Sequence, residues 1–184
     1  MSKSIRRLAL ALGLAAAAAA SPALAKNPMV GGAPMYANKT IVENAVNSKD
    51  HTTLVAAVKA AGLVDTLSGP GPFTVFAPTN AAFAKLPPGT VETLVQPQNK
   101  AQLTSILTYH VVPGVYTAKD LMAAARQGGG QAELKTVQGE PLTVTTRGKK
   151  VMVTDAKGNT ALVTTANVMQ SNGVIHVING VLLP

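Results

Sequence analysis

The segment NGVIHVINGVLLP, residues Asn172–Pro184, is a run of β-branched and aliphatic residues interrupted by turn-forming Asn-Gly pairs. A short apolar run between such turn signals is typical of a buried β-strand. Working back toward residue 132, further pairs of apolar residues recur with period two and are separated by turn signals at Gln138-Gly139, Arg147-Gly148 and Lys157-Gly158-Asn159. The last third of the chain is therefore predicted to be a set of antiparallel strands.

The preceding part of the chain predicts mainly helices. Thr40 and Glu43 have capping-box spacing, and apolar residues from Leu54 to Ala61 repeat at helical spacing up to Gly62. Further helices are expected at 80–86, 90–95, from Asn99 onward and at 118–126, and one buried strand is expected at 73–77. Helices grouped before strands predict a single α+β domain, which we place at residues 40–184.

The first 25 residues have the pattern of a cleaved export signal. Lys3, Arg6 and Arg7 precede an apolar run, and Ala23-Leu24-Ala25 is a small-residue cleavage site. Residues 26–39 contain prolines and glycines without periodicity and are expected to be a flexible or loosely docked leader. Because of this signal the protein is expected to be exported, either periplasmic or secreted. After cleavage no remaining stretch is apolar enough to span a bilayer.

Composition excludes several classes of function. The sequence has no cysteine, which excludes disulfides, thiolate metal sites and cysteine nucleophiles. It has no Trp and only three Phe and three Tyr, and the cations after residue 25 are scattered apart from the pair Lys149-Lys150, so nucleic-acid binding is not expected.

The three histidines are the remaining candidates for chemistry. His51 lies near a helix start, where an exposed residue is expected, whereas His110 and His176 each lie within an apolar run. A neutral imidazole hydrogen-bonded in the core is the favoured interpretation, and a metal ligand or a general base is the alternative. No metal-ligand spacing, serine elbow or phosphate loop is present, so we expect no catalytic residues, no metal, no cofactor and no enzymatic activity.

Three motifs carry a family resemblance. In order and spacing, TVFAPTNAAF (Thr74–Phe83), YHVVPG (Tyr109–Gly114) and NGVIHVINGVLLP resemble the first conserved box, the tyrosine-histidine motif and the second conserved box of the fasciclin (FAS1) domain family. The resemblance implies the FAS1 fold, a wedge-like β-sandwich of mostly antiparallel strands with helices packed on it. It also implies a non-enzymatic role in adhesion at cell surfaces or in extracellular matrix. By the same resemblance, a partner would bind at Tyr109, His110, Val111, Val112 and Pro113.

Two hypotheses for function follow from the resemblance. The first is a binding domain that attaches to a surface protein or polysaccharide, and the alternative is a carrier of an apolar, carotenoid-like or lipid-like small molecule. A single soluble domain bridges two surfaces only if it oligomerises or has two distinct binding faces. The sequence specifies neither the partner nor the oligomeric state.

Overall fold

The computed structural model describes residues 27–184, so the expected export signal lies outside the described residues. The helices are α1 (Ile41–Ala45), α2 (Thr52–Ala61), α3 (Val64–Ser68), α4 (Asn80–Phe83), α5 (Thr90–Leu94), α6 (Lys100–Tyr109) and α7 (Ala118–Gln127), with short 3-10 turns at Lys49–His51 and Pro97–Asn99. The strands are β1 (Met29–Val30), β2 (Ala33–Pro34), β3 (Phe73–Pro78), β4 (Val111–Pro113), β5 (Gln131–Lys135), β6 (Pro141–Arg147), β7 (Lys150–Thr154), β8 (Thr160–Gln170) and β9 (Gly173–Ile178). The predicted α+β class is confirmed.

Seven strands form one sheet in the order β4-β3-β9-β8-β7-β6-β5. All neighbours are antiparallel except β3 and β9, which run parallel from Phe73 beside Gly173 to Pro78 beside Ile178. Every residue of β9 is buried, which explains why its sequence is a continuous apolar run. Only glycine fits at position 173, because a Cβ there would lie 2.1 Å from the carbonyl oxygen of Phe73.

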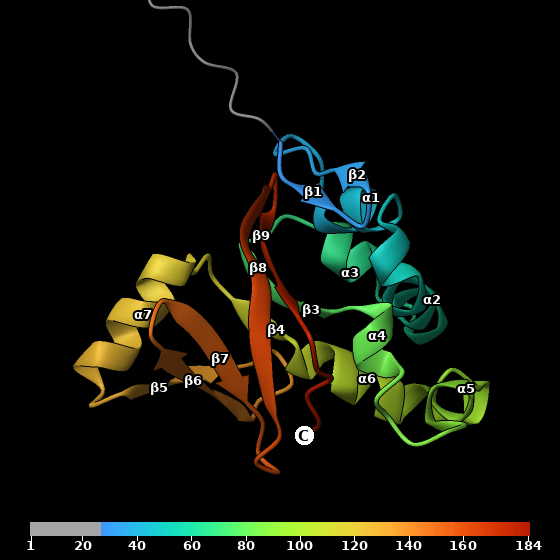
Figure 1. Ribbon diagram of the computed structural model, residues 1–184. Coiled ribbons are helices and arrows are strands. Elements are labelled where there is room, and N and C mark those ends of the chain that lie inside the picture. The colour runs from blue at the N-terminus through green and yellow to red at the C-terminus, as the bar shows by residue number, and fades with distance from the viewer. Residues whose placement is uncertain (1–26) are drawn as a thin grey trace, which may run out of the picture.

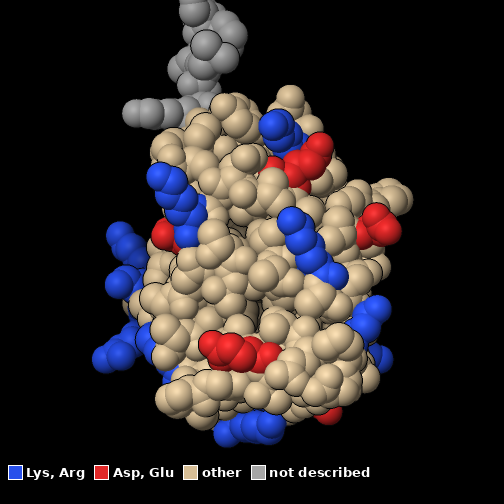
Figure 2. Space-filling view, turned by 90° about the vertical axis from the view of Figure 1, so that its right-hand side faces the viewer, with Lys and Arg blue, Asp and Glu red and all other residues tan. Residues whose placement is uncertain are grey.

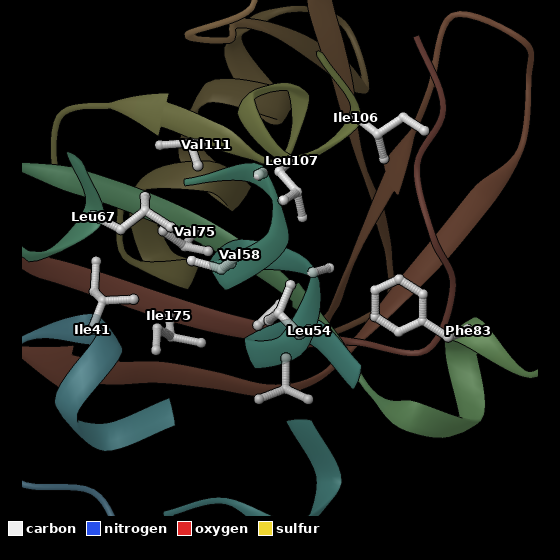
Figure 3. Close-up of a cluster of buried hydrophobic side chains, with 14 of the residues drawn as sticks. Ile41, Leu54, Val58, Leu67, Val75, Phe83, Ile106, Leu107, Val111 and Ile175 are labelled. Carbon is white, nitrogen blue, oxygen red and sulfur yellow. The ribbon is translucent and has the colours of Figure 1, made fainter. Parts of the chain in front are cut away.

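The molecule has a helical half and a sheet half (Figure 1). In the helical half, side chains from α1, α2, α3, α4 and α6 meet side chains from β3, β4 and β9 in one apolar cluster (Figure 3). In the sheet half, α7 packs against strands β5 to β7, and Leu121, Tyr109, Phe76 and Leu182 belong to a second cluster. The segment from Tyr109 to Val112 contributes to both clusters and therefore joins the two halves.

Helix starts follow the local sequence closely. Thr40 and Thr117 both form complete capping boxes, with Glu43 and Asp120 respectively. Each hydroxyl accepts a backbone N–H of the first turn, and each carboxylate accepts the backbone N–H of its threonine. The capping box predicted at Thr40 is confirmed, and the helix predicted at 118–126 begins with a second one.

Residues 28–36 are more ordered than a flexible leader. They form the β1–β2 hairpin, which buries Val30 and Met35 in the helical-half cluster. The carbonyl of Gly31 accepts the N–H of Lys49, and a Cβ at position 31 would lie 2.3 Å from Oγ of Ser48. The hairpin therefore covers this side of the core directly. Its apolar residues have no clear periodicity, which is why the sequence pattern did not predict it.

The two outer strands of the sheet approach each other. β4 and β5 are the end strands, yet the N–H of Val137, two residues after β5, donates to the carbonyl of Val111 in β4 at 2.8 Å. This contact closes the sheet on itself at one point, as expected for a wedge-like sandwich. Across residues 27–184, no helix is both long and apolar enough to cross a bilayer.

Candidate functional site

The tyrosine-histidine segment lies where a helix passes into a strand. Tyr109 is the last residue of α6, His110 is its C-cap, and β4 begins at Val111. Tyr109 is fully buried, His110 and Val112 are each 2% exposed, and Val111 is 4% exposed. Of the five residues expected to bind a partner, only Pro113 is exposed. The assignment of a partner to this segment stays a prediction, but direct contact on the folded surface would involve Pro113.

His110 is hydrogen-bonded on both ring nitrogens. Its Nδ1 donates to the carbonyl of Ile106 at 2.8 Å, and its Nε2 accepts the N–H of Leu182 at 3.0 Å. These two partners require a neutral ring, because a protonated imidazole could not accept from Leu182. Burial lowers the pKa of His110 from 6.5 to about 4, although the Ile106 carbonyl and Asp155 favour the charged form. The interpretation of His110 as a neutral core residue agrees with these contacts.

Tyr109 joins two turns of the sheet half. Its hydroxyl donates to the carbonyl of Pro141 and accepts the N–H of Ala156, each at 3.0 Å. Beside it, Asp155 accepts the N–H groups of Asn159 and Leu183. Burial is the largest cause that raises the pKa of Tyr109. The pair Tyr109-His110 therefore fixes α6, the β7–β8 turn and the C-terminal segment relative to one another.

His176 also has a structural environment. Its Nε2 contacts the carbonyl of Tyr116 at 2.7 Å, and its ring stacks on Phe76 with centroids 5.7 Å apart. Burial lowers the pKa of His176, which keeps the ring neutral. The prediction of a neutral, hydrogen-bonded core histidine fits this geometry.

His51 differs from the sequence prediction, because it is 3% exposed rather than on the surface. The β1–β2 hairpin and Ser48 cover it, and sequence pattern gave no indication of that cover. The hydroxyl of Ser48 lies 2.8 Å from Nδ1, while Nε2 has no hydrogen-bond partner. Burial lowers the pKa of His51, and the nearby Ala77 carbonyl opposes this by favouring the charged ring. This carbonyl does not form a hydrogen bond with Nε2.

The Ser48–His51 contact does not form a reactive dyad. Neither side chain reaches the surface, since Ser48 is 2% exposed and Gly31 packs against it. No carboxylate accepts from His51 Nε2, so nothing orients the ring as a base. Among residues 27–184, no three His, Asp or Glu side chains are grouped in a way that could hold a metal ion.

Two apolar cavities lie in the helical half. The first, of about 40 Å³, lies between α1, α2, α3 and β3 and reaches His110 at its inner end. The second, of about 30 Å³, lies under the β1–β2 hairpin beside His51. Both are much smaller than the roughly 300 Å³ or more of a typical small-molecule site. Larger hollows of about 290 to 410 Å³ surround α5, but they are open and partly polar.

The surface next to the tyrosine-histidine segment is apolar. Val115 is 42% exposed and Val137 is 46% exposed, and the Val137 N–H is bonded to Val111 of the segment. We call Pro113, Val115 and Val137 the motif patch. No charged residue lies between Tyr109 and Ala118, whereas the exposed Lys135 and Glu140 flank Val137 in the sequence.

Comparison with known proteins identifies the family. The Fasciclin domain model matches residues 49–184. Protein sll1483 of Synechocystis is 50% identical over 159 residues, which are 86% of this chain and 81% of that protein. Immunogenic protein MPB70 of Mycobacterium bovis is 39% identical over 195 residues, covering 95% of this chain and 92% of that protein.

A solved structure has the same fold. The FAS1 domain pair of the insect cell adhesion molecule fasciclin I superposes with a TM-score of 0.71 at 22% identity, covering 79% of this chain and 51% of that one. Together with the buried tyrosine-histidine segment, these matches show that the chain is a member of the fasciclin domain family.

Proposed function

We propose that the protein is an exported, non-enzymatic binding domain that attaches to a protein at a cell surface or in extracellular matrix, through the motif patch. The observation that carries the proposal is the exposed, uncharged patch beside a segment whose polar atoms are all used internally. Tyr109 and His110 set the position of the patch and do not touch the partner. The relation to a cell adhesion molecule supports the same class of function.

Polar groups in the core support a role without catalysis. Among the described residues, the only buried side-chain nitrogen or oxygen without a partner is Nε2 of His51. The other buried polar side chains, such as Asn44, Asn172 and Asp155, bond backbone groups and hold loops. Groups committed in this way are not free to exchange protons with a substrate.

Replacing the exposed valines should weaken attachment without unfolding the domain. We expect the double variant Val115→Ser and Val137→Ser to bind intact cells or isolated matrix about tenfold more weakly, because two apolar contacts are lost. The measurement is the fraction of labelled protein that binds the cells or matrix, taken over a range of protein concentrations. The matched control replaces Met29 and Val46, which are 57% and 49% exposed, by Ser. Equal binding by both double variants and the native chain would contradict the proposal.

A carrier of an apolar small molecule is the second candidate. The cavity between helices and β3 is lined almost entirely by apolar side chains, as a carrier requires, but about 40 Å³ is too little for a pigment or a lipid. The adhesion proposal is therefore favoured. An absorption spectrum and a mass analysis of an extract, taken on protein from its native host, distinguish the two. A stoichiometric chromophore or lipid would establish the carrier.

A further inference from the structure

One end of the sheet half gathers four cationic side chains, three of them from residues 147–150 and the fourth from α7. Arg126 lies in the last turn of α7, Arg147 and Lys150 are paired across β6 and β7, and Lys149 lies in the turn between them. Gln131, which follows α7 through three glycines, pairs with Thr145, so the end of α7 lies beside the β6–β7 turn. Figure 1 shows α7 and strands β5–β7 together at this side. We call Arg126, Arg147, Lys149 and Lys150 the basic end.

Carboxylates on the same elements lie too far away to neutralise the basic end. Glu133 pairs with Thr143, four residues from Arg147 and therefore about 13 Å along the strand. Asp120 is six residues from Arg126, about 9 Å along the helix, and its carboxylate caps α7. Both separations exceed the screening length of about 8 Å at physiological salt. The four cations are all exposed and make no ion pair with any residue from 27 to 184.

The turns at this end contain three glycines that face open space. Gly129, Gly130 and Gly148 lie in these turns, and a Cβ added at any of the three would have no atom within 4 Å. A chain-like anion could therefore lie across the end and reach several cations at once. The helical side of the molecule is different, because basic and acidic side chains are interspersed there (Figure 2).

We propose that the basic end binds an acidic polysaccharide. Nucleic acid fits less well, because none of the described Tyr or Phe residues lies at this end to stack on bases. A membrane surface fits less well, because the exposed large apolar residues lie elsewhere, at 29, 36, 46, 115, 137 and 169. A polymer of uronic acids needs only spaced charges, and these are present. The inference rests on the proposed binding function and adds a second face, distinct from the motif patch.

Immobilised polygalacturonate, with neutral dextran as the reference polymer, provides the test. Binding through four cations should weaken about fiftyfold between about 0.05 and 0.2 M NaCl, because counterions are released from the polymer. The quadruple variant Arg126→Gln, Arg147→Gln, Lys149→Gln and Lys150→Gln should lose this binding and its salt dependence. The control of equal net charge, Lys39→Gln, Lys49→Gln, Lys59→Gln and Lys100→Gln, should keep both.

Each outcome decides between explanations. Equal loss of binding in both quadruple variants would mean that net charge alone matters and would overturn the proposal. Equal retention of the native chain on polygalacturonate and on dextran would also overturn it. Tighter binding to duplex DNA or to anionic phosphatidylglycerol vesicles than to polygalacturonate would assign a different partner and would also overturn it. The variant Val115→Ser/Val137→Ser should bind polygalacturonate normally. If the native chain attaches to cells through the motif patch but does not bind polygalacturonate, only this inference is rejected. If the native chain binds polygalacturonate through the basic end but Val115→Ser/Val137→Ser attaches to cells normally, only the proposed function is rejected.

Discussion

Lowering the pH from about 6.5 to about 4 should reduce the free energy of unfolding by about 3 kcal/mol through His110 alone. In the folded protein the pKa of His110 is about 4, whereas an unfolded chain titrates near the ordinary value of 6.5. Between these values the unfolded chain binds a proton that the folded chain does not, so stability is complete above pH 6.5 and falls as the pH falls. Burial also lowers the pKa values of His51 and His176, which adds to the loss in the same direction.

Urea unfolding at a series of pH values measures this dependence. His110→Gln should remove about one proton from the pH dependence. The remainder should come from the other two histidines and, toward about pH 4, from Glu43 and Asp120, whose pKa values are lowered by hydrogen bonds from their capping threonines. NMR titration of the imidazole tests the same point without a variant, because the ring of His110 should stay neutral until the pH approaches 4. Titration of His110 near 6.5 in the folded protein would contradict the prediction.

Tyr109→Ala should cost about 4 kcal/mol of stability, a large fraction of the roughly 5–15 kcal/mol that holds a typical domain. Tyr109 is fully buried, and its removal leaves a cavity where α6 meets the sheet half. Its hydroxyl also bonds Pro141 and Ala156, so the change releases two turns. Thermal or urea unfolding of the purified variant measures the loss.

Tyr109→Phe separates the two contributions. It keeps the packing and removes only the hydroxyl, so we expect a loss of about 1 to 2 kcal/mol from unpairing the Pro141 carbonyl and the Ala156 N–H. Tyr36→Ala is the control, because Tyr36 is 39% exposed and its loss should cost about 0.5 kcal/mol or less. If Tyr109→Ala were as stable as Tyr36→Ala, the segment would not be the joint between the two halves.

Local structure was predictable from the sequence because its causes are local. Capping boxes at Thr40 and Thr117 and turn-bounded apolar runs act over a few residues, and the structure has the elements they predict. The parallel pairing of β3 with β9 was not predictable from periodicity, because it joins segments about a hundred residues apart that are both apolar throughout.

The same limit applies to the candidate sites. His51 was expected at the surface because the pattern around it is that of a helix start, and only the fold shows that residues 28–36 cover it. Arg147, Lys149 and Lys150 are already close in the sequence, but Arg126 joins them only because α7 ends beside the β6–β7 turn. The burial of His110 was expected from the sequence, because the histidine lies within an apolar run. Val137 joins the motif patch because its N–H bonds the carbonyl of Val111, and the sequence alone does not indicate this contact.

The position of β9 has a consequence for how the chain acquires its structure. β3 and β8 both pair with β9, so their inner backbone groups have no partner until residues 173–178 have been made. Pairing between segments this far apart in the chain is slow, because a long loop must close before any contact forms. A nascent chain therefore remains without its central sheet, and its folding should be late and all-or-none, since β3 and β8 find their shared partner only when the last strand is present.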